Sequence, residues 1–222
     1  GAAAPSSPPD HLAAILLSPV LGAIAAEITV RLPATAGERV RSSGRRTIAM
    51  ATACLAVGAW AAWALEGPTA PVGAALGAAL LLIAVVDAEH LWLPNLFTYP
   101  LGLAGLALAP LVGIGRMTDH LIGAAAGFLV LAGLAAAYRR VRGRDGLGGG
   151  DARLLAALGA WVGWAGLPTV LVWASAAGLS WVLARRLSGR AMRRDDPLPF
   201  GVCLAVGGWL TWLYGPLGRA GW

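Results

Sequence analysis

The sequence predicts an all-α, polytopic membrane protein: a bundle of about eight transmembrane helices with both termini outside. Three observations support this fold class. Hydrophobic residues make up 58% of the 222 positions and charged residues only 13%, about half the charged share of soluble domains. The mean hydropathy is +0.70. The apolar residues also form runs close to the length that crosses a bilayer as a helix, about 20 residues.

Four apolar runs occupy the first half of the chain, and polar or turn-forming residues separate them. Glu27 lies inside the first run, and no role is assigned to it. Gly67 and Pro68 follow the second run, and Asp87 directly follows the third. These expected spans cover about 11–30, 47–65, 71–86 and 96–114.

The second half contains four more runs. The sixth begins directly after Asp151, and Leu167 with Pro168 predicts a turn between the sixth and the seventh. Pro199 begins the eighth. These spans cover about 120–138, 152–166, 169–184 and 199–213.

The runs predict one membrane domain. Residues 1–10, rich in Ala, Pro and Ser, are expected to be a flexible or trimmed segment, and 11–222 a single integral-membrane domain. Cys54 and Cys203 lie inside apolar runs without a Cys-x-x-Cys pair, so we expect both to be core residues. No oligomeric state is predicted.

The arginines predict the orientation. The chain has no lysine, and 15 of its 17 basic residues lie in or beside three loops that eight crossings place on one side. The positive-inside rule makes that side cytoplasmic. Basic residues confined to short loops argue against a nucleic-acid partner. Six tryptophans near the expected outer ends are interpreted as an interfacial belt: Trp60, Trp63, Trp161, Trp164, Trp209 and Trp212.

Two acids are expected at the same membrane depth. Asp87 ends the third span and Asp151 begins the sixth, both on the cytoplasmic side. Two carboxyl groups held close together can share a proton, so that one activates water while the other protonates a carbonyl oxygen. Gly148, Gly149 and Gly150 would let a substrate backbone lie close to Asp151 and give the loop freedom to move.

The residues alone leave a structural interpretation open. An aspartate at a helix start often caps free N–H groups, and glycine-rich loops are often linkers. Asp195 and Asp196 beside arginines are expected to form a solvated loop.

Four motifs resemble those of the bacterial type IV prepilin peptidases, which are integral-membrane aspartyl proteases. Gly148-Gly149-Gly150-Asp151 resembles that family's Gly-x-Gly-Asp segment, and Asp87-Ala88-Glu89 followed by Pro94-Asn95 resembles its first aspartate segment. Arg31-Leu32-Pro33 and Pro199-Phe200-Gly201 resemble its flanking signatures. The motifs occur in the family's order along almost the whole chain.

The resemblance implies a role for each motif residue. Asp87 and Asp151 would be the catalytic pair, and Arg153 stands where the family usually has lysine. The substrate would be a prepilin or pseudopilin with a basic leader and an apolar stem, cut at the cytoplasmic face of a bacterial inner membrane, with lipid around the enzyme. The supporting residues would be Gly148, Gly149, Gly150, Glu89, Pro94, Asn95, Pro199, Phe200 and Gly201.

The chain departs from many family members in one loop. Many carry two Cys-x-x-Cys pairs for zinc after the first span and also methylate the new N-terminus with S-adenosylmethionine. Here the loop at about 31–46 contains no cysteine, so we expect a short form without zinc. The peptidase step would need no cofactor, and S-adenosylmethionine would serve only a retained methyltransferase activity. A metal site at His90 with Asp87 and Glu89 is disfavoured because His11 and His120 map to the other side.

Two other functions remain open. A proton-coupled transporter could use Asp87 and Asp151 as a relay, but it predicts acids near the midplane and pseudo-symmetric halves. A presenilin-like intramembrane protease shares the Gly-x-Gly-Asp segment. The Pro94-Asn95 pair and the segment beginning at Pro199 favour the prepilin branch.

Overall fold

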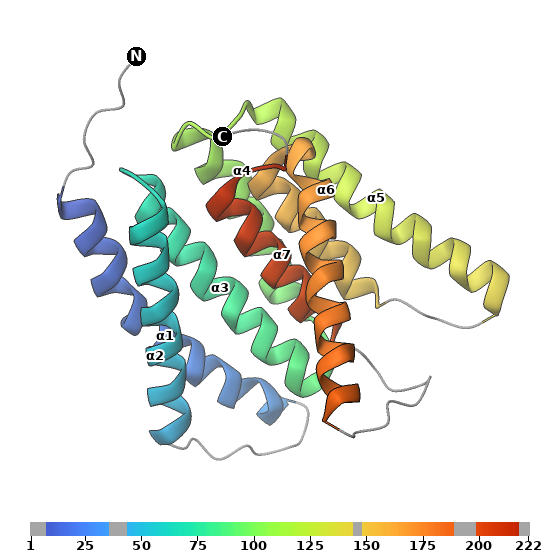
Figure 1. Cartoon of the computed structure of the whole chain (residues 1–222), viewed down its shortest axis with the longest axis horizontal. Coiled ribbons are helices and arrows are strands. Elements are labelled where there is room, and N and C mark those ends of the chain that lie inside the picture. The colour runs from blue at the N-terminus through green and yellow to red at the C-terminus, as the bar shows by residue number, and fades with distance from the viewer. Residues whose placement is uncertain (1–7, 36–43, 144–147, 189–198, 218–222) are drawn as a thin grey trace. The chain divides into compact units, whose positions relative to one another are not determined.

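The computed structural model describes residues 8–35, 44–143, 148–188 and 199–217. In these ranges the regular structure is helical, and none of the described residues lies in a strand. The all-helical fold class is therefore confirmed. The helices are α1 (Pro8–Thr35), α2 (Gly44–Ala64), α3 (Thr69–His90), α4 (Asn95–Leu111), α5 (Met117–Arg142), α6 (Gly149–Leu187) and α7 (Phe200–Tyr214) (Figure 1).

Five of these helices, α1, α2, α3, α5 and α6, are long and apolar enough to cross a membrane. The other two, α4 and α7, are shorter apolar helices. The chain is therefore a multi-pass membrane protein. The count of eight spans and the outside location of both termini stay predictions.

The chain forms two compact units, and the first contains α1, α2 and α3 up to Val85. Small residues let α1 and α2 approach closely. A methyl group on Gly58 would overlap the Ser18 side chain, and one on Gly22 would lie 2.7 Å from the Ala51 Cα. Cys54 is buried in this unit, as expected.

The second unit, from Val86 onward, is organised around α6, which packs against α4, α5 and α7 (Figure 1). The backbones of α5 and α6 meet at Gly123 and Gly159, where a methyl group on either residue would overlap the other's carbonyl oxygen. On α7, Gly207 packs against Val170 and Gly208 against Leu158. Close backbone packing of this kind is typical of membrane helices.

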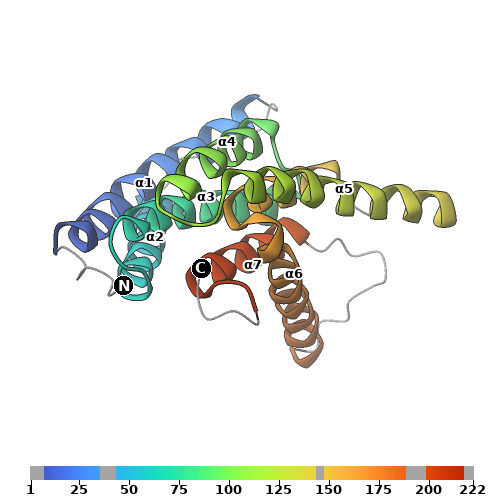
Figure 2. The same ribbon diagram turned by 90° about the horizontal axis from the view of Figure 1, so that it is seen from above.

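A sharp kink divides α6 at Gly163, whose φ of 66° and ψ of 177° are not helical. Both ends of α6 lie below this kink in Figure 1, and Figure 2 shows its two segments running in different directions. The turn expected at Leu167 and Pro168 was wrong, because both residues are helical. Only glycine adopts this backbone conformation readily, so the chain turns five residues before Pro168.

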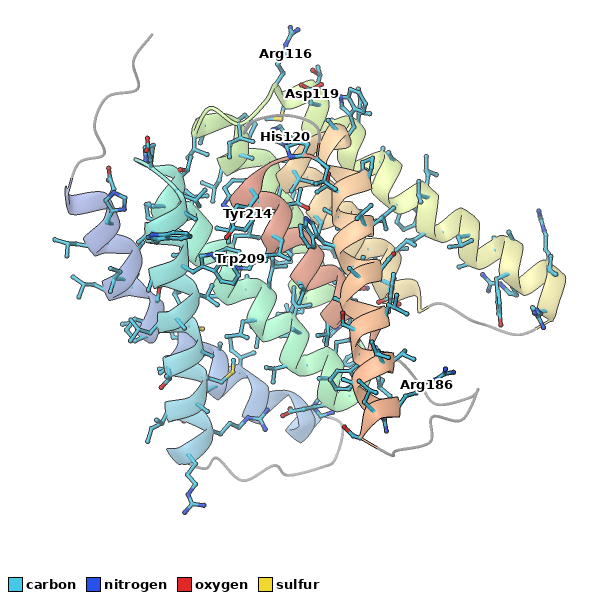
Figure 3. The ribbon with its side chains drawn as sticks, in the orientation of Figure 1. Arg116, Asp119, His120, Arg186, Trp209 and Tyr214 are labelled. Atoms are coloured by element: carbon cyan, nitrogen blue, oxygen red, sulfur yellow. The ribbon has the colours of Figure 1, made fainter. Side chains whose placement is uncertain are left out.

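His120 connects the start of α5 to the end of the first α6 segment. Its side chain is 1% exposed. Its Nδ1 lies 3.0 Å from the Ala160 carbonyl oxygen, and its Nε2 faces the carbonyl oxygen of Ile114. Next to it, Asp119 accepts a hydrogen bond of 3.1 Å from the Trp164 Nε1. Figure 3 shows Asp119 and His120 at the N-terminal end of α5, so polar contacts here hold the region of the kink.

The tryptophan belt is only partly supported. Trp161 and Trp212 are 2% and 0% exposed and form an edge-to-face pair with ring centroids 5.2 Å apart. The Trp161 Nε1 donates a hydrogen bond of 2.8 Å to the Leu101 carbonyl oxygen. The interfacial interpretation was therefore wrong for this pair and for Trp209, which is 8% exposed. Trp60, Trp63 and Trp164 are the exposed members of the set.

Candidate active site

Asp87 lies near the end of α3 and is only 5% exposed. Its carboxylate meets the start of α7, where the Val202 N–H donates a hydrogen bond of 3.1 Å to Oδ2. The backbone of Gly201 is a second donor to this carboxylate. The first N–H groups of a helix have no partner within the helix and attract anions. Asp87 therefore caps α7 from a distant part of the chain.

The contact between the Asp87 carboxylate and the start of α7 requires a glycine at position 201. A methyl group at this position would lie 2.7 Å from the Asp87 Oδ2 and 2.9 Å from the Leu93 Cδ1. Contacts this short between non-bonded heavy atoms are repulsive. The glycine of the Pro199-Phe200-Gly201 motif thus leaves the space that the carboxylate fills.

Asp151 occupies the first turn of α6 and is half-buried. Its N–H donates a hydrogen bond of 3.1 Å to the Gly148 carbonyl oxygen. The carboxyl group is close enough to Asp87 for direct electrostatic interaction. Cys203, in the first turn of α7, interacts in the same way with both acids. The second unit therefore brings Asp87 and Asp151 together beside the start of α7.

Leu93 joins the segments that carry the two acids, and sequence reasoning missed it. It is 4% exposed. A methyl group on Gly150 would lie 2.8 Å from its Cβ, and its Cδ1 approaches Gly201. Leu93 therefore packs against the residue before Asp151 and against the helix start that binds Asp87. No specific signal in the sequence points to it, because Leu93 is one of three apolar residues, with Leu91 and Trp92, between the polar ends of the first aspartate segment.

The structure gives a packing reason for one glycine of the run, and the expected approach of a substrate backbone stays a prediction. Gly148, the N-cap of α6, has a φ of −69° and a ψ of 138°, which any residue can adopt. Among the described residues, a methyl group on Gly149 would contact only the Arg153 guanidinium, at 3.9 Å. Gly150 is the tight position, because Leu93 leaves no space for a side chain. Close packing, rather than an unusual backbone conformation, accounts for glycine at position 150.

The remaining motif residues surround the pair at different depths. Pro94 is buried as the N-cap of α4, while Asn95 and Glu89 are exposed. Pro199 is the N-cap of α7, and it and Phe200 are half-buried. Glu89 lies 3.9 Å from the His90 Nε2.

In the described part of the chain, no three His, Cys, Asp or Glu side chains gather as a metal site would require. Glu27 is exposed, and the pair Asp195 and Asp196 lies outside the described residues.

Residues 74–183 match the model of the Type IV leader peptidase family. This range contains both acids and Leu93. A protein of Burkholderia pseudomallei is 42% identical over 170 residues, which are 76% of this chain and 54% of that protein. A protein of Aeromonas hydrophila is 40% identical over 136 residues, which are 61% of this chain and 47% of that protein.

A protein of Pseudomonas aeruginosa is 37% identical over 137 residues, which are 61% of this chain and 47% of that protein. All three relatives are named prepilin leader peptidase/N-methyltransferase. The chain spans about half the length of these relatives. No solved structure gives a significant match.

Proposed function

The chain belongs to the type IV leader peptidase family, and from this premise we propose that it is a membrane-embedded aspartyl endopeptidase that removes the leader of type IV prepilins or pseudopilins. One observation carries the proposal. Asp87 and Asp151, 64 positions apart in sequence, lie within electrostatic reach of each other in a largely buried site. Two close carboxyl groups are the chemical requirement for aspartyl proteolysis.

The pair would work by general acid–base catalysis. One carboxylate takes a proton from water as the water oxygen attacks the scissile carbonyl carbon, and the other carboxylic acid gives its proton to the carbonyl oxygen. The C–N bond then breaks, and the leaving amine takes a proton from the pair. The Val202 N–H on Oδ2 holds Asp87 in one orientation during these steps.

The positions of both acids near helix ends suit a cut at the membrane boundary. Asp87 lies in the last turn of α3, and Asp151 in the first turn of α6. A prepilin has a basic leader followed by an apolar stem, so its cleavage site would meet the pair there. We place the site on the cytoplasmic side of a bacterial inner membrane, where the enzyme would serve a type IV pilus or type II secretion system.

Methyl transfer is a separate activity in the relatives' printed name. It would use S-adenosylmethionine as methyl donor. The described residues assign no site for this molecule, and the proposed peptidase step does not require it. The mass of the cleaved product reports whether its new N-terminus is methylated.

The first experiment incubates the purified chain, reconstituted in lipid, with a prepilin. We predict that Asp87→Asn and Asp151→Asn each reduce cleavage by about 10²–10⁴-fold, because each removes one proton-transfer group. Glu66→Gln is the matched control, since it neutralises an exposed acid that belongs to none of the four motifs. Its cleavage rate should stay within a few-fold of wild type.

Three outcomes would contradict the proposal. Cleavage that survives either aspartate substitution would remove the acid pair from the mechanism. Proton-coupled uptake of a solute without cleavage would support a transporter. Cuts within the apolar stem, located by mass spectrometry, would indicate a presenilin-like protease.

A further inference from the structure

A groove of about 490 Å³ lies between α4, α5 and α6 in the second unit. Its wall consists mainly of small and apolar side chains. The α6 side contributes Ala156 and Ala160, and Ala124 and Phe128 line it from α5. Gly102 and Leu106 line it from α4. The groove is distinct from the acid pair, since neither Asp87 nor Asp151 lines it.

Polar groups lie at one end of this groove. Gly102 of α4 packs against Ala157 of α6, and Gly105 packs against Ala160, so Thr98 and Arg153 each lie about one turn before the first of these contacts. Arg153 lies two positions after Asp151, and Ala160 lies seven positions further along α6, about 10 Å away at 1.5 Å per residue. Thr98 is 2% exposed, and its hydroxyl has no hydrogen-bond partner among the residues described. The Arg153 Nε is also buried without a partner in that part of the chain. Burying such groups unpaired costs free energy.

The volume of the groove decides what can enter it. An α-helix about 10 Å across fills roughly 120 Å³ per residue, so 490 Å³ would enclose only about one helical turn. A flexible hydrocarbon chain is much narrower and follows an irregular apolar wall. The positive charge of Arg153 at one end of the groove would pair with an anionic head group. Guanidinium groups bind phosphate oxygens in bidentate geometry.

We propose that this groove binds an anionic phospholipid, with an acyl chain between α4, α5 and α6 and its phosphate at Arg153 and Thr98. Basic pockets between membrane helices recognise lipid head groups in this way. The Arg153 guanidinium also approaches Gly149, so the bound phosphate would lie beside the loop that presents Asp151. The lipid would therefore support the first turn of α6.

The test measures lipid retention rather than proteolysis. The full chain is exchanged into detergent containing equal amounts of phosphatidylglycerol and phosphatidylcholine, and retained lipids are counted by native mass spectrometry. Wild type should prefer phosphatidylglycerol by about fivefold, the preference that one basic group gives. Arg153→Gln should abolish this preference, and Arg153→Lys should keep most of it.

A matched pair on α5 tests the groove itself. Ala124 lines the groove, while the adjacent Ala125 is exposed. Ala124→Leu should fill the space and lower retention of both lipids, whereas Ala125→Leu should retain them as wild type does. Asp87→Asn should also retain lipid, so that failure of the peptidase proposal stays distinguishable from failure of this one.

Equal retention of the two lipids by wild type would overturn the proposal, as would an unchanged preference in Arg153→Gln. Equal retention by Ala124→Leu and Ala125→Leu would do the same. If Ala124→Leu left lipid retention intact but raised the KM for a prepilin, the groove would bind the substrate's stem instead. Arg153→Gln leaves the small residues of the helix interfaces unchanged, so it keeps the test valid if Ala124→Leu misfolds.

Discussion

Gly201 and Leu93 show how single residues shape the candidate site. Leu93 approaches the positions of both Gly150 and Gly201, so one apolar side chain fixes the spacing of the segments that carry Asp151 and bind Asp87. The N–H groups at the start of α7 then orient the Asp87 carboxylate. The size of the side chains at these positions therefore determines the geometry of the candidate site together with the two acids.

We predict that Gly201→Ala reduces cleavage by about tenfold or more. The new methyl group would lie 2.7 Å from the Asp87 Oδ2, so the carboxylate or the start of α7 must move, and small displacements of catalytic groups cost rate steeply. The measurement is kcat/KM on a prepilin. Gly133→Ala on α5 is the control, because no atom of the described residues lies within 4 Å of its added methyl group.

A Gly201→Ala variant with the kcat/KM of wild type would show that the contact with Asp87 does not position it for the reaction. The control should keep full activity. It should also be slightly more stable, because alanine is favoured over glycine within helices by about 0.5–1 kcal/mol.

Among the elements, α6 determines the arrangement of the second unit. Its first segment begins at the candidate site, and its kink at Gly163 lies beside Asp119 at the start of α5. Adjacent glycines of α7 then contact Leu158 before the kink and Val170 after it. The kink therefore lets a single helix, α7, pack against both segments.

We predict that Gly163→Ala lowers the free energy of unfolding by about 1–3 kcal/mol, because alanine rarely adopts a φ of 66° with a ψ of 177°. Space is not the cause, since the nearest atoms would be 3.7 Å from the new methyl group. Unfolding in mixed micelles, with Gly133→Ala as the reference, measures the change. An unchanged stability would mean that the kink can form without glycine.

At the scale of the whole molecule, the arginines predict which side of the membrane each loop faces. Arg116 precedes α5, and Arg186 lies in the last turn of α6. Figure 3 shows these residues toward opposite ends of the second unit. The positive-inside rule then places Arg186 in the cytoplasm and Arg116 outside.

Thiol labelling tests this orientation. In intact cells, a membrane-impermeant maleimide should label Arg116→Cys and should reach Arg186→Cys only after permeabilisation. The unsubstituted chain is the background control, since Cys54 and Cys203 are both buried. The reverse pattern of labelling would place the acid pair on the outer side and contradict cleavage of a cytoplasmic leader.

Much of this protein could be predicted from the sequence because membrane burial and motif chemistry are local properties. Apolar runs identify helices wherever the surrounding lipid cannot satisfy backbone hydrogen bonds. The order of the four motifs indicated Asp87 and Asp151 as a pair and identified the family. The burial of Cys54 and Cys203 was also predicted correctly.

Tertiary structure alone decided features that depend on distant neighbours. Leu93 lies at the candidate site only because α6 and α7 begin beside it, and Trp161 is a core residue only because Trp212 and the Leu101 carbonyl meet it. The turn in α6 lies at Gly163 because a positive φ, rather than the nearby proline, produces the reversal. Composition and hydropathy describe each residue's preference for lipid or water, whereas these contacts depend on which backbones approach one another.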